Sequence, residues 1–223
     1  MKKIIVNGAN GKMGSEVVNL ILKKENTKLV GVCDKKGVGK KIKSDINKKC
    51  NLKIRENLAN LLKEKNADIV IDFTTPNVVM ENIRLVLNND YNMIVGTTGI
   101  TDGDLEEIKK SVGKNKIIIA PNFAIGAVLM MEFSKKIAKY MDDVEIIELH
   151  HDKKIDSPSG TSLRTAELIR ENMKNKREDK SKFIESIKGA RGAVKNDINI
   201  HSVRLKGLVA HQEVIFGTEG QSL

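Results

Sequence analysis

The sequence predicts an α/β protein with a doubly wound parallel sheet, followed by a second, smaller α+β domain. Three observations support this prediction. Short apolar runs rich in Ile and Val alternate with amphipathic segments through the first half, each pair is joined by a turn, and the rhythm changes after Phe123. Strands that alternate with helices form parallel sheets with right-handed crossovers. The length of 223 residues is enough for two such domains.

The first domain, residues 1–123, is expected to contain five strands and four helices. Apolar runs predict strands at 2–9, 28–34, 67–73, 92–98 and 116–123. Apolar residues at helical spacing predict helices at 14–24, 57–65, 75–87 and 101–112. Thr75 is placed to cap a helix that has Pro76 in its first turn, and Thr101 precedes Asp104 as in a capping box.

The second domain, residues 124–206, is expected to hold a mixed, largely antiparallel sheet and two helices. The pattern predicts helices at 126–141 and 160–173 and strands at 143–151, 198–207 and 209–217. We expect the Met-rich face of the helix at 126–141 to pack in the core, and the charged segment 174–182 to form a solvated loop. Residues 207–223 are expected to return to the first domain.

Composition excludes some classes of protein. No apolar run approaches the ~18 residues that span a bilayer, and no signal peptide precedes the first strand, so we expect a cytoplasmic protein without membrane contact. Cys33 and Cys50 are expected to be free thiols. The net charge of +10 invites a nucleic-acid interpretation, but the lysines are spread out and aromatic residues make up 3%. We expect no nucleic-acid partner and a basic surface that attracts small anions.

A glycine-rich turn follows the first strand. In "GANGKMG", Gly8, Gly11 and Gly14 are spaced three apart and lead into a helix whose free amides can bind a pyrophosphate. The spacing differs from the standard G-x-G-x-x-G, and close strand-to-helix packing alone could also require the glycines. Lys12 inside the turn is placed either to touch a phosphate or to remain in water.

An acidic residue after the second strand strengthens the nucleotide interpretation. Asp34 lies twenty positions beyond Gly14, where a carboxylate can accept hydrogen bonds from a ribose. Lys35 and Lys36 follow it and could bind the additional phosphate of NADPH, so we expect both NADH and NADPH to bind. At the ends of the third and fourth strands, turn residues could position the nicotinamide half, although ordinary turn formation also explains them: Phe73, Thr74, Gly96, Thr97 and Thr98.

The stretch "ELHHDKKIDSPSGTS" combines a proton donor, positive charge and exposed amides. The turn before the helix at 160–173 leaves amides near Ser159, Gly160 and Thr161 available to a carboxylate, and Lys154 adds positive charge. A histidine can donate a proton near neutral pH, but His150 and His151 point to opposite faces of an extended strand. A zinc site is disfavoured, because neither histidine spacing nor cysteine position suits it, and we expect no metal.

Several motifs together resemble the 4-hydroxy-tetrahydrodipicolinate reductase family, also called dihydrodipicolinate reductases. They are "VNGANGKMG", "DFTTP", "VGTTG", "APNFAIG", "ELHHDKKIDSPSGTS" and "HSVRLKG" with "AHQEVIFG", in the family's order. The resemblance implies a Rossmann-like first domain and hydride transfer from NADH or NADPH to a cyclic dicarboxylate, with loss of water, in the diaminopimelate route to lysine. It also implies a homotetramer assembled through the second domain.

The resemblance implies roles for individual residues. His150 matches the general acid, Lys154 its catalytic partner, and His151, Gly160 and Thr161 match substrate contacts. Cofactor contacts are implied for Gly8, Lys12, Met13, Asp34, Gly96 and Thr98 and for the APNF segment: Ala120, Pro121, Asn122 and Phe123. The role of Arg204 stays open. We expect the cofactor and the substrate to meet in the cleft between the two domains.

One departure and two alternatives remain. Family members continue past "GTEGQSL" with a further strand and helix, so we expect stability and cofactor affinity to be affected more than catalysis.

Another nicotinamide enzyme, such as aspartate-semialdehyde dehydrogenase, would need a nucleophilic cysteine, and both cysteines precede the third strand. A non-catalytic NADH-sensing module would use the same glycine turn but would leave His150 and Lys154 unexplained.

Overall fold

The computed structural model describes residues 1–44, 50–120, 122–174 and 184–223, and the chain divides into two compact units, Met1–Pro121 and Asn122–Leu223. We describe each unit by itself. Within the described residues, no helix is long and apolar enough to cross a membrane. The expected loop at 174–182 falls almost entirely outside the described residues.

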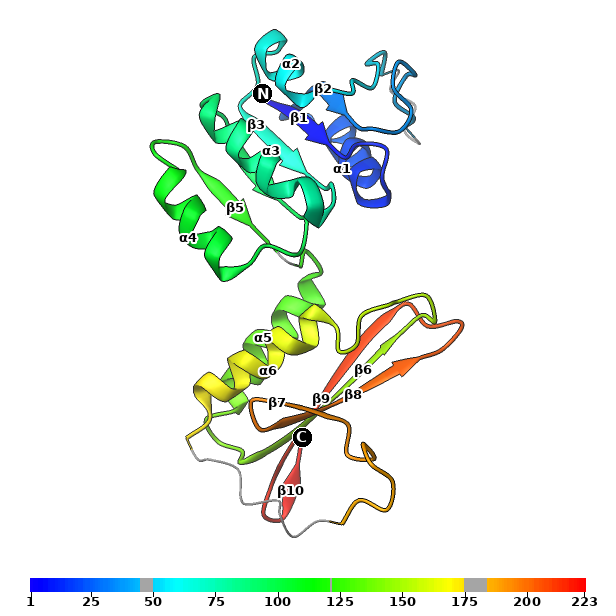
Figure 1. Ribbon diagram of the computed structural model, residues 1–223, viewed down its shortest axis with the longest axis vertical. Helices are drawn as coiled ribbons and strands as arrows, with labels where there is room; N and C mark the ends of the chain where they lie inside the picture. Colours follow the sequence, from blue (N-terminus) through cyan, green and yellow to red (C-terminus); the bar gives the residue numbers. More distant parts are fainter. Residues whose placement is uncertain (45–49, 121, 175–183) are drawn as a thin grey trace. The chain divides into compact units, whose positions relative to one another are not determined.

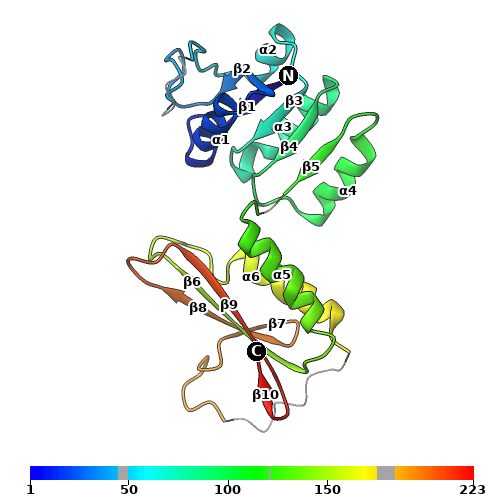
Figure 2. The same cartoon turned by 180° about the vertical axis from the view of Figure 1, so that it is seen from behind.

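The first unit is built on a five-stranded parallel sheet, as the alternating pattern predicts (Figures 1 and 2). The strand order is β2-β1-β3-β4-β5. The strands are β1 (Lys2–Asn7), β2 (Thr27–Cys33), β3 (Ile69–Asp72), β4 (Asn92–Val95) and β5 (Ile117–Ile119). Because all five run in the same direction, their carboxyl ends and the turns that follow lie along one edge of the sheet.

Helices cover both faces of this sheet. On one face α1 (Lys12–Lys23) packs Val18 and Ile21 against Ile4 and Val6 of β1. The other face forms a larger core with three helices: α2 (Leu58–Glu64), α3 (Pro76–Asn88) and α4 (Asp102–Ser111). Thr101 forms the predicted capping box with Asp104. Thr75 is the N-cap of α3, but its side chain makes no capping hydrogen bond.

The second unit holds a mixed sheet in the order β10-β9-β6-β8-β7, with α5 and α6 on one face (Figure 1). Its elements are α5 (Ile125–Ile137), β6 (Asp143–His150), α6 (Gly160–Asn172), β7 (Ala193–Lys195), β8 (Ile198–Arg204), β9 (Ala210–Thr218) and β10 (Gln221–Ser222). Three of the four strand pairs are antiparallel, and β6 with β8 is parallel. This confirms the predicted largely antiparallel sheet.

Two expectations differ from the structure. Residues 207–223 do not return to the first unit, because β9 pairs with β6 along its whole length from Asp143 to His150 and carries β10 at the sheet edge. The helix α5 is less buried than expected: Ser134 is its buried residue, Met130 and Met131 are half-buried, and Ile125 and Phe133 are 76% and 53% exposed. The helix carries more apolar surface than the second unit covers.

Candidate active site

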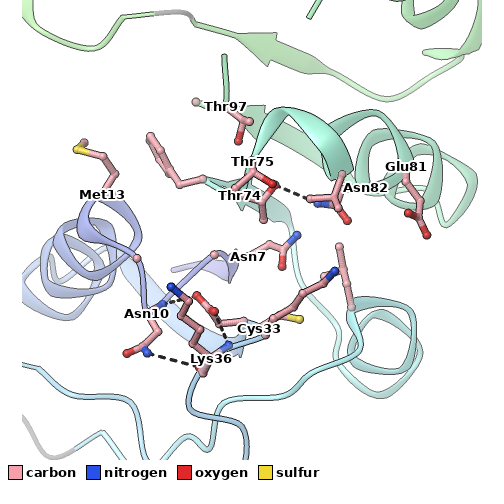
Figure 3. Close-up of a pocket in the computed structure, with 18 of the residues that line it drawn as sticks. Asn7, Asn10, Met13, Cys33, Lys36, Thr74, Thr75, Glu81, Asn82 and Thr97 are labelled. Carbon is pink, nitrogen blue, oxygen red and sulfur yellow. Dashed lines mark hydrogen bonds between the residues drawn. The ribbon is translucent and has the colours of Figure 1, made fainter. Parts of the chain in front are cut away.

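A cavity of about 910 Å³ opens at the carboxyl ends of β1 to β4 in the first unit (Figure 3). The turn after each of these strands contributes to its wall, as expected for ligand sites in parallel sheets. Eleven residues that the sequence predicts for the cofactor line it: Gly8, Gly11, Lys12, Met13, Asp34, Lys35, Phe73, Thr74, Gly96, Thr97 and Thr98. Its volume is in the range of small-molecule and cofactor sites.

The glycine turn at one side of the cavity depends on glycine for steric reasons. Gly8 has φ +78°, and a Cβ there would lie 2.4 Å from the carbonyl oxygen of Phe73. A Cβ on Gly14 would lie 1.9 Å from the carbonyl oxygen of Gly8. The N-cap of α1 is Gly11, which has no side chain to occupy the amides of the first turn. The turn therefore brings backbone amides and a helix N-terminus to the cavity, the arrangement that binds phosphates.

Asp34 is held beside this turn by backbone amides. One carboxylate oxygen accepts from the amide of Asn10 at 2.9 Å, and the other accepts from the amide of Lys36 at 2.8 Å. Figure 3 shows Asn10 and Lys36 together at this side of the pocket. Carboxylate oxygens accept several bonds each, so Asp34 can still accept from ribose hydroxyls. Lys35 and Lys36 both line the cavity, and these residues fit the adenosine half of NADH or NADPH.

A buried carboxylate, Asp72, holds a second group of cavity-lining residues in place. The sequence did not predict a functional role for it. One oxygen accepts from the amide and hydroxyl of Thr74, at 3.0 and 2.7 Å, and from the hydroxyl of Thr97 at 2.9 Å. The other accepts from the side-chain amides of Asn7 and Asn82, at 2.8 and 2.9 Å. Asp72 is fully buried, and its hydrogen bonds join the ends of β1, β3 and β4 to α3.

Not every predicted cofactor residue lies in this cavity. Gly14 packs under the turn, and Ala120 follows β5, where its amide donates to Val95. Pro121 lies outside the described residues. Asn122 and Phe123 belong to the second unit, and the Asn122 amide contacts the Thr161 hydroxyl at 3.4 Å.

The histidine stretch forms a cluster at the end of β6 in the second unit. His150 and Glu148 lie two residues apart on the strand and so share one face, and Nδ1 of His150 bonds Oε2 of Glu148. Oε1 of Glu148 accepts from the Arg204 guanidinium at 2.8 Å. Burial raises the pKa of Glu148, but hydrogen bonds from Arg204 and Ser202 outweigh it and hold that pKa below its usual range. His151 follows the strand and is exposed.

Lys154 is positioned by a carboxylate of its own loop. Its Nζ donates to both oxygens of Asp156, at 2.7 and 2.8 Å. The hydrogen bond from this ammonium is the main cause that lowers the pKa of Asp156. The backbone carbonyl of Asp156 accepts from Arg204 at 2.6 Å, so the same guanidinium ties this loop to Glu148.

The start of α6, which supplies the predicted anion site, is fixed by side chains. Ser159 is its N-cap and accepts from the amide of Ser162. Gln212 of β9 accepts from the Ser162 hydroxyl at 2.8 Å and donates to Thr165 at 2.9 Å. Ser159 is buried, whereas Gly160 is exposed and Thr161 half-buried. Gly160 and Thr161 are therefore the accessible residues of the predicted set.

Family models match both units. The model for the N-terminus of dihydrodipicolinate reductase matches residues 2–123, and the model for its C-terminus matches residues 126–223. The chain belongs to the dihydrodipicolinate reductase family. A 4-hydroxy-tetrahydrodipicolinate reductase of Listeria welshimeri is 46% identical over 224 residues, covering 99% of this chain and 85% of the relative.

Two further relatives agree. A 4-hydroxy-tetrahydrodipicolinate reductase of Bacillus cereus is 46% identical over 99% of this chain and 84% of its own length. The dipicolinate-bound dihydrodipicolinate reductase of Paenisporosarcina sp. TG-14 superposes with a TM-score of 0.83 at 42% identity, covering all of this chain and 86% of that one. The resemblance drawn from the motifs is therefore confirmed, as are the Rossmann-like first unit and NADH or NADPH as the cofactor of this reductase family.

Sequence reasoning missed some residues of these sites. In the cavity they include Asn7, Asn10 and Asn82, which bond to Asp34, Lys36 or Asp72 through contacts between distant segments. In the second unit it missed Glu148 and Gln212. The alternation of side chains along β6 could have indicated Glu148, because His150 lies two positions away on the same face.

Proposed function

We propose that this dihydrodipicolinate reductase reduces 4-hydroxy-tetrahydrodipicolinate to tetrahydrodipicolinate with NADH or NADPH, with loss of water, in the diaminopimelate route to lysine. The observation that carries the proposal is the match of both halves of the chain to the two models of this family, with 46% identity to named reductases. Both sites suit the reaction chemically. The cavity of the first unit fits a dinucleotide, and the cluster at the end of β6 in the second unit combines a histidine with anion-binding groups.

The roles of individual residues follow from their surroundings. Bound NADH or NADPH supplies the hydride. His150 donates the proton that the reduction consumes, because its imidazole is held by a carboxylate and remains 15% exposed. Lys154 is the catalytic partner of His150 and adds positive charge to the site. The amides of Gly160 and Thr161 bind a carboxylate of the substrate, since a helix N-terminus favours an anion. His151, whose backbone carbonyl accepts from the amide of Lys154 at 3.1 Å, contacts the substrate.

In the first unit, the glycine turn with Lys12 and Met13 binds the pyrophosphate, and Asp34 binds the adenosine ribose. Lys35 lies next to Asp34, where a cation accommodates the additional phosphate of NADPH. The turns that contain Phe73, Thr74, Gly96, Thr97 and Thr98 hold the nicotinamide half. Support for these roles comes from the cavity that these residues line together.

The thioester mechanism of an aspartate-semialdehyde dehydrogenase is disfavoured. It needs a reactive thiolate, and burial together with the carboxylates of Asp34 and Asp72 raises the pKa of Cys33 to about 12. Cys50 is free and partly exposed but lies outside the residues that line the cavity.

We also propose a cytoplasmic homotetramer that takes a small dicarboxylate as substrate. The free cysteines suit a reducing compartment. The face of the second sheet that α5 and α6 do not cover carries exposed apolar side chains, including Val194 and Ile215, which suits association. Light scattering after size exclusion measures the assembly, and a monomer at micromolar concentration contradicts it.

The variant His150→Gln tests the proposed chemistry. We expect kcat for the reduction to fall by roughly 10²- to 10⁴-fold, the contribution of a general acid, while NADH binds as before. His211→Gln, which changes an exposed histidine of β9, is the matched control and should retain kcat. Equal kcat in the two variants would remove His150 from the mechanism, and cofactor binding without any turnover in the unaltered protein would favour a sensing module.

A further inference from the structure

Glu148 is a fully buried carboxylate that faces the proposed general acid. Its side chain is 0% exposed, and its partners are His150, Arg204 and Ser202. Oε2 bonds Nδ1 of His150, and Oε1 accepts from Arg204. Burying a carboxylate is costly in free energy unless a cation and hydrogen bonds compensate it, so the negative charge at this place depends on the cation Arg204 and on the hydrogen bond from Ser202.

Strand pairing places Arg204 within hydrogen-bonding distance of Glu148. It lies opposite His150 in the parallel pair of β6 and β8, and one of its terminal nitrogens reaches both Glu148 and the backbone carbonyl of Asp156. The other terminal nitrogen donates to the carbonyl of Val203, and Nε is buried without an acceptor among the described residues. The guanidinium thus leaves one donor unsatisfied while it joins Glu148 to the loop that carries Lys154.

The contact with Glu148 determines which nitrogen of His150 carries the exchangeable proton. An ionised carboxylate can only accept hydrogen bonds, so Nδ1 of His150 must carry a hydrogen toward Glu148. In the charged imidazole both nitrogens carry hydrogens, and the proton that leaves is then the one on Nε2. After the transfer, the neutral ring keeps its hydrogen on Nδ1 and is ready to be protonated again at Nε2.

We propose that Glu148 and Arg204 are positioning residues for the general acid: Glu148 fixes the ring of His150 with Nδ1 toward itself and Nε2 as the proton donor, and Arg204 keeps Glu148 charged and tied to the Lys154 loop. This inference rests on the proposed role of His150. It assigns to the carboxylate the task of orienting the ring and fixing which nitrogen carries the hydrogen, as the aspartate does in hydrolase triads.

The same strand offers a matched control. Glu145 also pairs with a histidine and an arginine: Oε2 bonds His201 at 2.6 Å and Oε1 accepts from Arg191 at 2.7 Å. Because Glu145 lies three residues before Glu148, the two carboxylates project from opposite faces of the sheet. Glu145→Gln therefore makes the same chemical change in a His-Arg pair that the mechanism does not use.

The variant Glu148→Gln gives a defined geometry. Arginine can only donate, so the amide oxygen of the new side chain turns to Arg204 and its NH₂ group faces Nδ1 of His150. Nδ1 must then accept, the neutral ring carries its hydrogen on Nε2, and the charged ring loses its carboxylate partner. We expect kcat to fall by roughly 10²- to 10⁴-fold, up to the loss in His150→Gln, with the KM for NADH unchanged.

Two readouts separate this role from a structural one. Nitrogen-15 NMR of the imidazole, assigned with His150→Gln, should show the neutral ring protonated at Nδ1 in the unaltered protein and at Nε2 in Glu148→Gln. Steady-state oxidation of NADH should give the loss in kcat for Glu148→Gln and unchanged kcat for Glu145→Gln. Thermal unfolding of each variant checks the fold.

The outcomes are distinguishable. A kcat for Glu148→Gln equal to that of Glu145→Gln, or a neutral His150 protonated at Nε2 in the unaltered protein, overturns the inference while the proposed function stands. Absence of substrate reduction in the unaltered protein overturns the proposed function, and NMR still decides the state of the ring. If Glu148→Gln does not fold, Glu148→Asp and Arg204→Lys replace it. Each should keep the Nδ1 hydrogen but lose kcat, and full kcat in both overturns the inference.

Discussion

Replacing Asp72 by asparagine should destabilise the first unit strongly, although the change exchanges a single carboxylate oxygen for an NH₂ group. The carboxylate is fully buried and accepts five hydrogen bonds at the carboxyl ends of three strands. The new side chain would keep an oxygen for the two donors of Thr74 and for Thr97, but its NH₂ group would face the amides of Asn7 and Asn82.

The magnitude follows from those two contacts. The Asn7 amide is buried, and the loss of its acceptor costs about 1–3 kcal/mol in the free energy of unfolding, whereas the half-buried Asn82 amide also donates to Thr74 and adds less. That is a large fraction of the roughly 5–15 kcal/mol typical of whole domains. Because Thr74 and Thr97 line the cofactor cavity, NADH affinity should fall as well.

Asp90→Asn provides the control, because it makes the same change at an exposed ion pair of this unit. Asp90 lies 3.5 Å from Lys114 and its side chain is 66% exposed, so its loss should cost about 0–1 kcal/mol. Urea unfolding followed by circular dichroism measures both variants, and amide exchange in peptides from 1–44 and 50–120 locates the effect. Equal urea midpoints for the two variants would refute the reasoning.

Three further predictions concern the turn, the thiols and acid stability. Gly14→Ala should weaken NADH binding by about tenfold or more, since its Cβ would lie 1.9 Å from the Gly8 carbonyl oxygen and overpacking costs about 1–3 kcal/mol. Gly103→Ala, with no contact closer than 3.8 Å, should bind NADH normally in the same titration, and similar affinities would contradict the steric argument. Iodoacetamide should alkylate Cys50 well before Cys33, whose thiol has a pKa raised to about 12 by burial and nearby carboxylates, and peptide mass spectrometry would expose the reverse order. The pKa of Glu148 in the folded state lies below 4.5, its ordinary value, so ionised Glu148 stabilises the fold at pH values above 4.5. This contribution is lost as the pH falls below 4.5 and passes the folded-state pKa. The melting temperature should therefore fall less steeply with acidification in Glu148→Gln, and an identical slope would argue against an ionised Glu148.

The parallel sheet of the first unit could be predicted because its signals are local. Each strand, turn and helix carries its own pattern, and Thr101 with Asp104 marks a helix start within four residues. The glycine turn and Asp34 were likewise predictable, since a fixed separation along the chain places both at the ends of neighbouring strands.

Contacts between distant segments were not predictable in this way. Arg204 lies 56 positions from Glu148, and only the parallel pairing of β6 with β8 brings the two together. The network around Asp72 requires three strand ends to meet, and no single window of sequence contains it. The degree to which α5 is buried was not predictable either, because apolar periodicity indicates a face that avoids water without indicating what covers it.

The central claim is that this chain reduces its proposed substrate. The decisive measurement follows the absorbance of NADH and of NADPH as the unaltered protein is mixed with freshly generated 4-hydroxy-tetrahydrodipicolinate, with His150→Gln alongside. We predict oxidation of the cofactor that depends on the substrate, forms tetrahydrodipicolinate and is nearly lost in the variant. Tight binding of either cofactor without substrate-dependent oxidation would contradict the claim.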